Sequence, residues 1–494
     1  MLSRRTFNAG LAAAASLAAQ TRRPPNILFI CSDQHSGPVM GCNGHPVVKT
    51  PNMDRLARMG VLFRNAYTGS PVCAPGRAGM MSGRYPSDVD SFCNSTPLGH
   101  VPTWGNYLRD AGYACRAFGK MDLSDGVDYG FEASGVTNGH SEGPDITSLF
   151  RSPVCFRQGE RDNVDGDFRD REHHDVRVMR DTVNQLKQAP GAGPWALYVG
   201  LTQPHPKWVA PSKYRDIYPP EKMPLPVIPD GYLEKRHTFF QIVANFKNIQ
   251  VPIPVERVQR ARAAYYGMVS ELDSHIGMLL DRLEASGQME NTLIVYTADH
   301  GEMLGDHGLW LKNVLLENAA RVPLILAGAG LPKGKVVDRP VAHVDMVATM
   351  LDLAGAHKPP KGRGVSLAGS ALPEFTYSES HSESNCTGSF MLRKGDWKYL
   401  YFTGDVPLLF NLRDDPGELH NLAGNAETKA MQKELHQHLT SLVEPDDVTR
   451  RAFDAQQRVL LNMVKRMKRE EFYEEISGRL GSAQAWVQTN RYYA

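Results

Sequence analysis

Residues 26–35 read NILFICSDQH, and this stretch decides the fold. The run from Asn26 to Cys31 is almost unbroken in its apolar character, which is typical of a buried parallel strand. It ends in polar residues that include Asp33 and Gln34. In α/β folds the carboxyl ends of parallel strands are where functional sites form. The stretch therefore predicts a central strand with a site at its tip.

The same pattern recurs along the chain. Further strands are predicted at 113–118, 195–201, 292–297 and 323–327, and helices at 50–60, 104–111 and 256–285. Strands that alternate with helices and repeatedly end in polar clusters predict an α/β protein with a doubly wound sheet covered by helices on both faces. We expect residues 122–170 to form loops over the site and 204–254, rich in proline, to be irregular.

Past Pro359 the pattern changes to short strands separated by turns, at 375–378, 389–393, 397–401 and 407–411. They predict a smaller antiparallel sheet, which a helix at 427–443 could cover. The charged tail is predicted to be helical and to pack along the surface. We expect a catalytic domain at 24–358, a C-terminal subdomain at 359–446 and a helical extension at 447–494.

Composition excludes several classes of protein. The chain has 494 residues, 41% of them hydrophobic, and a formal net charge of +1. Neither disorder nor a nucleic-acid-binding surface is indicated, so any anionic substrate must be recognised locally. Its seven cysteines form no C-x-x-C pair, which argues against a zinc knuckle. The spacing of the cysteines leaves room for one or two disulfide bonds and does not assign their pairing.

The first twenty residues predict a targeting signal. Arg4 and Arg5 precede an Ala/Leu run from Ala9 to Ala19 whose end could be a cleavage site. The pattern resembles a twin-arginine signal, which implies export by that machinery to the periplasm or the medium; a frayed N-terminus is the alternative. The run is too short for a membrane span, and no later stretch reaches about 20 apolar residues.

Residues 70–84 read SPVCAPGRAGMMSGR and hold the candidate nucleophile, Cys73. Because proline is tolerated in a first helical turn, Pro75 indicates that the cysteine sits where a turn feeds a helix. The bland alternative is a small buried hydrophobe. Polar residues at several strand ends favour a catalytic role for Cys73 over a purely structural one. They are Asp33 with Gln34, Lys120 with Asp122, His205, and Asp299 with His300.

From Asn26 to about residue 425, the chain resembles the type I sulfatases of the alkaline-phosphatase superfamily. Residues 73–77 and 81–84 resemble the signature in which the cysteine is oxidised to formylglycine (3-oxoalanine). Residues 299–308 and Lys312 resemble the second metal and lysine block, and residues 321–324 follow as expected. The resemblance implies an alkaline-phosphatase-like mixed sheet and, as a partner during maturation, a formylglycine-generating enzyme.

The resemblance also assigns roles. The divalent-metal ligands would be Asp33, Gln34, Asp299, His300 and the modified Cys73. Carboxylates and an amide oxygen suit Ca²⁺, while His300 leaves Mg²⁺, Mn²⁺ or Zn²⁺ open. Positive charge on the sulfate would come from Arg77, Lys120 and Lys312. One hydroxyl of the aldehyde hydrate would attack sulfur, His205 would protonate the leaving alcohol, and the second hydroxyl would then expel sulfate.

Two residues depart from the pattern. Gly76 stands where the signature commonly has serine, although the core Cys-x-Pro-x-Arg is intact. Asp122 stands where many sulfatases have histidine, two residues after Lys120, and it becomes the candidate base for sulfate elimination.

A narrower resemblance is to arylsulfatase K and its bacterial relatives, carried by residues 118–122, 204–206, 378–381 and 391–393. It implies removal of 2-O-sulfate from glucuronate at the end of a glycosaminoglycan. Glu379, His381 and Arg393 would then line the sugar pocket, with Arg393 facing the uronate carboxylate. The alternative is that they are ordinary polar residues at strand ends.

Three rival functions stay open. A phosphodiester or phosphonate monoester hydrolase would use the same metal ligands. A non-catalytic binder of sulfated glycans would keep the fold without the reaction. A thiol hydrolase using Cys73 with His205 would leave the metal-type carboxylates unexplained.

Overall fold

The structure is a computed structural model that describes residues 24–137, 146–151, 155–187, 193–382 and 384–493. The predicted signal at 1–20 lies outside the described residues. In the part of the chain that is described, no helix has the length and apolar character needed to cross a membrane.

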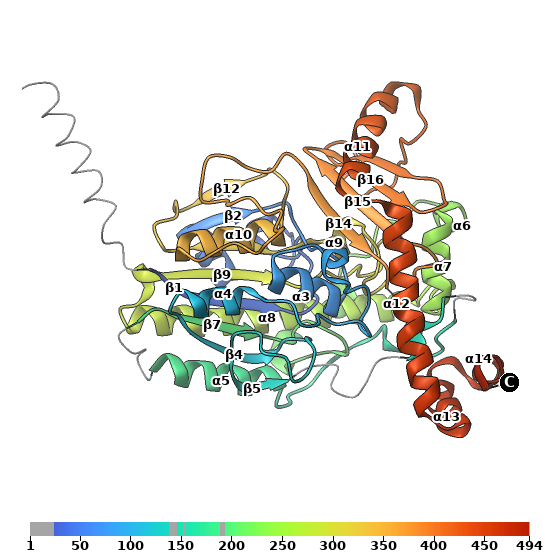
Figure 1. Cartoon of the computed structure of the whole chain (residues 1–494), viewed down its shortest axis with the longest axis horizontal. Helices are drawn as coiled ribbons and strands as arrows, with labels where there is room; N and C mark the ends of the chain where they lie inside the picture. Colours follow the sequence, from blue (N-terminus) through green and yellow to red (C-terminus); the bar gives the residue numbers. More distant parts are fainter. Residues whose placement is uncertain (1–23, 138–145, 152–154, 188–192, 383, 494) are drawn as a thin grey trace, which may run out of the picture.

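A central sheet of eight strands organises the molecule (Figure 1). Its spatial order is β12 (Lys335–Val337), β2 (Gly60–Phe63), β11 (Leu324–Ala327), β9 (Thr292–Ala298), β1 (Asn26–Ser32), β7 (Trp195–Gly200), β4 (Ala114–Lys120) and β5 (Glu132–Thr137). Strand β1 pairs in parallel with β7 and β9, so Ile27 lies opposite both Ala196 and Leu293. Strand β11 runs antiparallel to β9, which makes the sheet mixed. The prediction of an α/β fold on a mixed sheet is confirmed.

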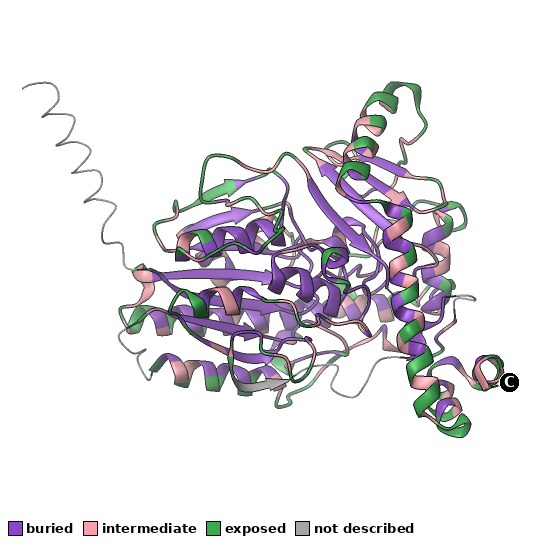
Figure 2. Ribbon diagram, in the orientation of Figure 1, coloured by how far each residue is buried: buried purple, intermediate pink, exposed green. Residues whose placement is uncertain are grey.

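Strand β1 is buried along its whole length (Figure 2). Its alternating side chains belong to two hydrophobic clusters, one on each face of the sheet. Ile27 and Phe29 pack toward α3 (Cys73–Ser82), α4 (Trp104–Asp110) and α10 (His343–Ala354). Leu28 and Ile30 pack toward α2 (Pro51–Met59), α5 (His174–Lys187) and α8 (Val255–Ala285). Helices on both faces explain the continuous apolar run.

Two stretches expected to be irregular contain regular structure, so those expectations are wrong in part. Residues 122–170 include β5, an edge strand beside β4, and β6 (Gly166–Phe168), which pairs with β8 (Trp208–Ala210). Residues 204–254 include the helix α7 (Thr238–Phe246). Edge strands do not need a long apolar run, and the surrounding prolines obscured the helix.

The predicted C-terminal antiparallel sheet is confirmed. It consists of β14 (Thr376–Ser380), β15 (Ser389–Lys394), β16 (Trp397–Phe402) and β17 (Leu408–Asn411), in that order. One face packs on α11 (Lys429–Leu442) through Leu435 and Leu439, and the other packs on α7, where Phe239 lies 4.7 Å from Phe402 between ring centroids.

The remaining described elements are short strands and helices and the C-terminal helices. They are β3 (Ala66–Tyr67), β10 (Arg321–Val322), β13 (Val341–Ala342), α6 (Tyr232–Lys235), α9 (Glu317–Ala320), α12 (Pro445–Arg466), α13 (Arg469–Leu480) and α14 (Ser482–Tyr493).

A buried ion network joins the C-terminal sheet to the central domain. Lys398 on β16 is fully buried, and its ammonium lies 2.9 Å from the Glu317 carboxylate and 2.8 Å from that of Glu418. Because two carboxylates share this cation, neither is a buried charge without compensation.

Replacing Lys398 by methionine should strongly destabilise the protein, since two buried carboxylates would lose their shared cation. We expect a loss of about 3–5 kcal/mol in the free energy of unfolding, measured by urea denaturation. Lys333→Met is the control, because Lys333 and its partner Glu290 are exposed, and it should cost less than about 0.5 kcal/mol. Equal stabilities of the two variants would contradict this role.

Candidate active site

The structure places Cys73 at the first residue of α3, as the sequence predicts. Its side chain is buried, with the Lys312 ammonium 2.7 Å from Sγ and Nε2 of His300 3.3 Å from it. The next residue, Ala74, donates its backbone N–H to the side-chain oxygen of Asn94 at 3.1 Å. Asn94 thereby satisfies one of the free donors at the helix start.

Four of the predicted ligands converge on one point. Asp33 at the end of β1, Cys73 on α3, and Asp299 and His300 after β9 place one ligand atom each within 4.8 Å of one another, and all four are buried. We refer to them as the metal group. They come together because β1 and β9 are adjacent parallel strands that end at the same edge of the sheet.

The donor atoms fit a divalent cation. Oδ1 of Asp33 and Oε1 of Gln34 are buried and have no hydrogen-bond partner among the described residues. Nδ1 of His300 donates a hydrogen bond to the carbonyl oxygen of Gly301 at 3.0 Å. Because a carbonyl can only accept, Nδ1 keeps its proton and Nε2 presents a lone pair to the group. Buried acceptors of this kind need a cation or a donor to satisfy them.

Glu302 holds Gln34 in place, a role that the sequence did not single out. The Gln34 amide nitrogen donates to Glu302, whose other oxygen accepts the backbone N–H of Leu304 at 3.0 Å and of Leu311 at 2.6 Å. This contact leaves the Gln34 carbonyl oxygen as the group that can bind metal. The sequence signal for this role was a glutamate that directly follows Asp299, His300 and Gly301.

Arg77 lies under the metal group and is fully buried. It donates to Asp299 at 2.8 Å, to the Lys120 carbonyl at 2.8 Å and to the Tyr198 hydroxyl at 2.9 Å. One nitrogen also lies 3.5 Å from Asp33. Through these contacts Arg77 supports the carboxylates of Asp33 and Asp299.

Lys120 and Asp122 form an ion pair beside the group, with the ammonium 3.0 Å from the carboxylate. Lys120 also contacts Asp33. Burial has the largest single effect on the pKa of the Asp33 carboxyl and raises it. The combined effect of nearby cations, led by Lys120, nevertheless holds that pKa well below its ordinary value. Asp33 is therefore an ionised ligand at neutral pH.

Close backbone contacts explain why residue 76 is a glycine. A Cβ on this residue would lie 2.7 Å from the carbonyl oxygen of Ser70 and 2.8 Å from that of Asp299. Both contacts are with backbone, which cannot easily move, so only glycine lets α3 approach the Asp299 strand end this closely.

A cleft of about 340 Å³ opens beside the metal group. Its lining includes Gln34, Lys312 and His205, together with Asn94, Arg157, Glu160, Asn163, Lys207, Phe246 and Lys247. Nδ1 of His205 lies 2.7 Å from the carbonyl of Pro206, so that nitrogen carries a proton and Nε2 is left to exchange one with a substrate.

The three residues expected to bind sugar do not line this cleft, and the structure corrects that expectation. Glu379 is fully buried and bonds to Ser87, Tyr377 and His381. Arg393 donates to Tyr67 and to the Gly395 carbonyl, and pairs with Glu317. Their contacts with Ser87, Tyr67 and Glu317 join the C-terminal sheet to the central domain, which matches the alternative that they are ordinary polar residues at strand ends.

The metal group could hold a divalent cation beside Cys73 and Lys312, and comparison with known proteins identifies the family of the chain. The Sulfatase family pattern matches residues 25–356, and the pattern named N-sulphoglucosamine sulphohydrolase, C-terminal, matches 305–445. The chain belongs to the sulfatase family and is a sulfuric ester hydrolase.

Individual relatives agree with this assignment. The chain is 33% identical to choline-sulfatase of Rhizobium meliloti (strain 1021), over 82% of this chain and 83% of the relative. It is 30% identical to mouse (Mus musculus) arylsulfatase K, over 86% and 80%. A phosphonate monoester hydrolase of Agrobacterium radiobacter superposes with TM-score 0.72 at 25% identity, covering 85% and 95%. A solved 2-O GAG sulfatase gives TM-score 0.67 at 25% identity, covering 88% and 94%.

Removing one metal-group carboxylate should weaken cation binding. We expect Asp33→Asn to lower the affinity for a divalent cation by at least about 10-fold, because it removes a charge and one oxygen ligand. Calorimetric titration of metal-depleted protein with Ca²⁺ measures this. Asp128→Asn, on an exposed ion pair with Arg109, should leave the affinity unchanged. Equal affinities in the two variants would refute the assignment of the group.

Proposed function

We propose that this enzyme releases sulfate from a sulfated sugar, with the 2-O-sulfate of a uronate in a glycosaminoglycan as its substrate. The observation that carries the proposal is the convergence of Lys312 and the metal group, which includes Cys73, beside a basic cleft that Lys312 and Gln34 line. Support comes from the relatives named arylsulfatase K and the structural neighbour titled a 2-O GAG sulfatase.

We infer that Cys73 is converted to formylglycine and that the metal is Ca²⁺. The hydrated aldehyde would supply an oxygen nucleophile at the position of the cysteine sulfur. The ligands would be Asp33, Gln34, Asp299 and His300, and two carboxylates with an amide oxygen suit Ca²⁺. Mg²⁺, Mn²⁺ or Zn²⁺ are the alternatives that His300 leaves open.

The surrounding side chains divide the remaining work. Lys312 points its ammonium at residue 73, where it stabilises negative charge on a sulfate oxygen. Arg77 holds Asp299 and Asp33 in register, and with Lys120 and Lys312 it would supply positive charge beside the sulfate. His205, with a proton on each ring nitrogen, would donate the Nε2 proton to the leaving oxygen and keep the one on Nδ1. Asp122 is the candidate base for sulfate elimination, with Lys120 fixing its carboxylate.

Export is a further part of the proposal. The twin-arginine pattern would direct folded protein to the periplasm or the medium, after a formylglycine-generating enzyme has acted on Cys73. A sulfated polysaccharide outside the cytoplasm would then be the substrate.

Phosphonate monoester hydrolysis is the second candidate, favoured by the similarity to the Agrobacterium enzyme. The metal group would serve either ester. Rates on an aryl sulfate and on an aryl phosphonate monoester separate the two, and we expect the sulfate to be the faster substrate. A clear preference for the phosphonate would overturn the sulfated-sugar proposal.

Cys73→Ala should abolish turnover, because no other side chain can supply the nucleophile at the start of α3. We expect at least a 10⁴-fold loss of kcat on the aryl sulfate. Peptide mass spectrometry of the native protein should show the aldehyde or its hydrate at residue 73. Full activity in a protein with only unmodified cysteine would disprove the proposed maturation.

His205→Ala tests the general acid. A poor leaving group needs its proton in the transition state, so we expect kcat to fall about 10²- to 10⁴-fold on a sulfated sugar. The loss should be much smaller on 4-nitrophenyl sulfate, whose leaving oxygen needs no proton. The same loss on both substrates would mean that His205 has a different role.

A further inference from the structure

The C-terminal extension, predicted at 447–494, lies outside both matched family ranges, the second of which ends at residue 445. It consists of α12 to α14, seen in red at one side of the molecule in Figure 1. Its function is therefore open to inference from its contacts.

The extension packs under two segments that line the cleft. Leu460, Phe472, Ile476 and Leu480 form a hydrophobic cluster with Cys93 and Cys155. Cys93 precedes Asn94, and Cys155 lies two residues before Arg157; both Asn94 and Arg157 line the cleft. Burying these neighbours against the extension fixes where the two cleft residues lie.

Hydrogen bonds from the extension hold the backbone on either side of Arg157. The Gln484 side chain accepts from the Phe156 N–H and donates to the Phe156 carbonyl, both at 2.9 Å. The N–H of Gln158 donates to the Arg479 carbonyl at 2.9 Å. The chain is thus tied immediately before and after Arg157.

Arg157 itself is placed for recognition. Its guanidinium carbon lies 4.8 Å from the centroid of the Phe246 ring, and Nη1 lies 3.0 Å from a Glu160 oxygen. Both partners also line the cleft. Arg157 is 8% exposed and keeps Glu160 on Nη1, so its guanidinium is held at the cleft wall; a guanidinium is the side chain best suited to bind a carboxylate.

The charge of the cleft points to the same ligand chemistry. Its lining has four cationic side chains and the single carboxylate of Glu160; the cations are Arg157, Lys207, Lys247 and Lys312. Lys207 is exposed and has no ion-pair or hydrogen-bond partner among the described residues. Such a cleft attracts a second anion and opposes a quaternary ammonium.

We propose that Arg157 determines specificity by binding the carboxylate of a sulfated acidic sugar, with Lys207 at the rim, and that Gln484 is a positioning residue that acts through Arg157. The inference rests on the proposed sulfatase function. It assigns carboxylate recognition to the segment held by the extension, instead of to Arg393, which does not line the cleft and is bonded to Tyr67 and Gly395.

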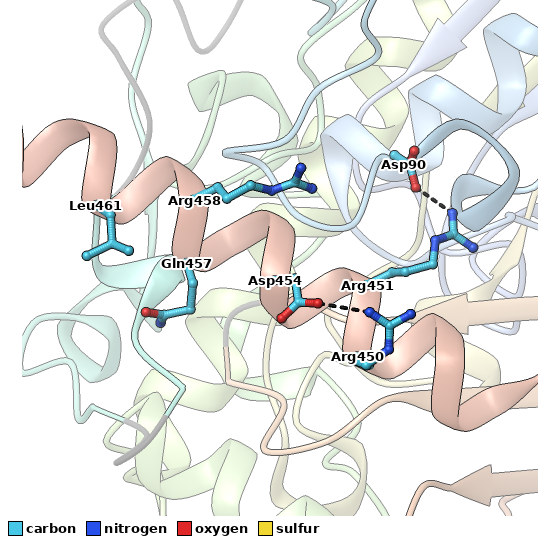
Figure 3. A pocket seen from close by; sticks show the side chains of 7 residues that line it. All are labelled: Asp90, Arg450, Arg451, Asp454, Gln457, Arg458 and Leu461. Carbon is cyan, nitrogen blue, oxygen red and sulfur yellow. Dashed lines mark hydrogen bonds and ion pairs between the residues drawn. The ribbon is translucent and has the colours of Figure 1, made fainter.

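A second basic hollow, on the outer side of α12, provides the control (Figure 3). Arg450 pairs with Asp454 and Arg451 with Asp90, so their charges are compensated locally. Arg458 is exposed, lines the same hollow and lies outside the active-site cleft. Arg458→Gln therefore removes the same charge as Arg157→Gln from the same region.

The experiment compares a uronate 2-sulfate disaccharide with its uronate methyl ester, which keeps the sulfate and loses the charge. Arg157→Gln should lower kcat/KM on the acid about 10- to 100-fold, mainly through KM, and change it less than about 3-fold on the ester. Arg458→Gln should change neither. Gln484→Leu should lower the preference for the acid while leaving turnover of 4-nitrophenyl sulfate intact.

Each outcome decides the inference. Equal losses of Arg157→Gln on acid and ester, or no loss on either, would overturn it. Wild-type protein that cleaves 4-nitrophenyl sulfate but does not distinguish acid from ester overturns the inference alone. If wild-type protein cleaves no sulfate ester, the proposed function fails. Calorimetric binding of the acid and ester to Cys73→Ala, with and without Arg157→Gln, then still tests carboxylate recognition.

Discussion

The contact on which the site depends is the ion pair between Arg77 and Asp299, buried without exposure to solvent. A guanidinium in this position holds carboxylates from β1 and β9 near one another, although their mutual repulsion opposes that arrangement. The same side chain binds the carbonyl at the end of β4 and a hydroxyl on β7. One residue of α3 therefore links four strands of the sheet, and the helix start that carries Cys73 is fixed with it.

Close packing sets the second condition. The backbone contacts at Gly76 bring α3 against the Asp299 strand end without a side chain between them. Only at this separation can Cys73 and His300 reach the same point. Serine at this position, common in the family signature, would need a different approach of the helix in this chain. Gly76, which departs from the family signature, is therefore part of the geometry that brings Cys73 close to His300.

Residues placed by local sequence were predictable, whereas those placed by tertiary contacts were not. Asp33 and Asp299 follow apolar strands, so their convergence follows from the rule for parallel sheets. The family resemblance implied that Arg393 binds sugar, and the sequence does not show that Glu317, from a distant helix, pairs with it. Arg157 carried no motif, and its place in the cleft comes from packing against a tail hundreds of residues away.

The tie between the C-terminal helices and the segment around Arg157 separates two properties of the molecule. In the proposed function, ester cleavage depends on residues between β1 and Lys312, while the cleft wall at Arg157 is held by residues after 445. Changes in the tail can therefore alter which ester is accepted without disturbing the bond-breaking centre. Within such a lineage, substrate range would drift faster than the reaction, and the tail rather than the signature would record the shift.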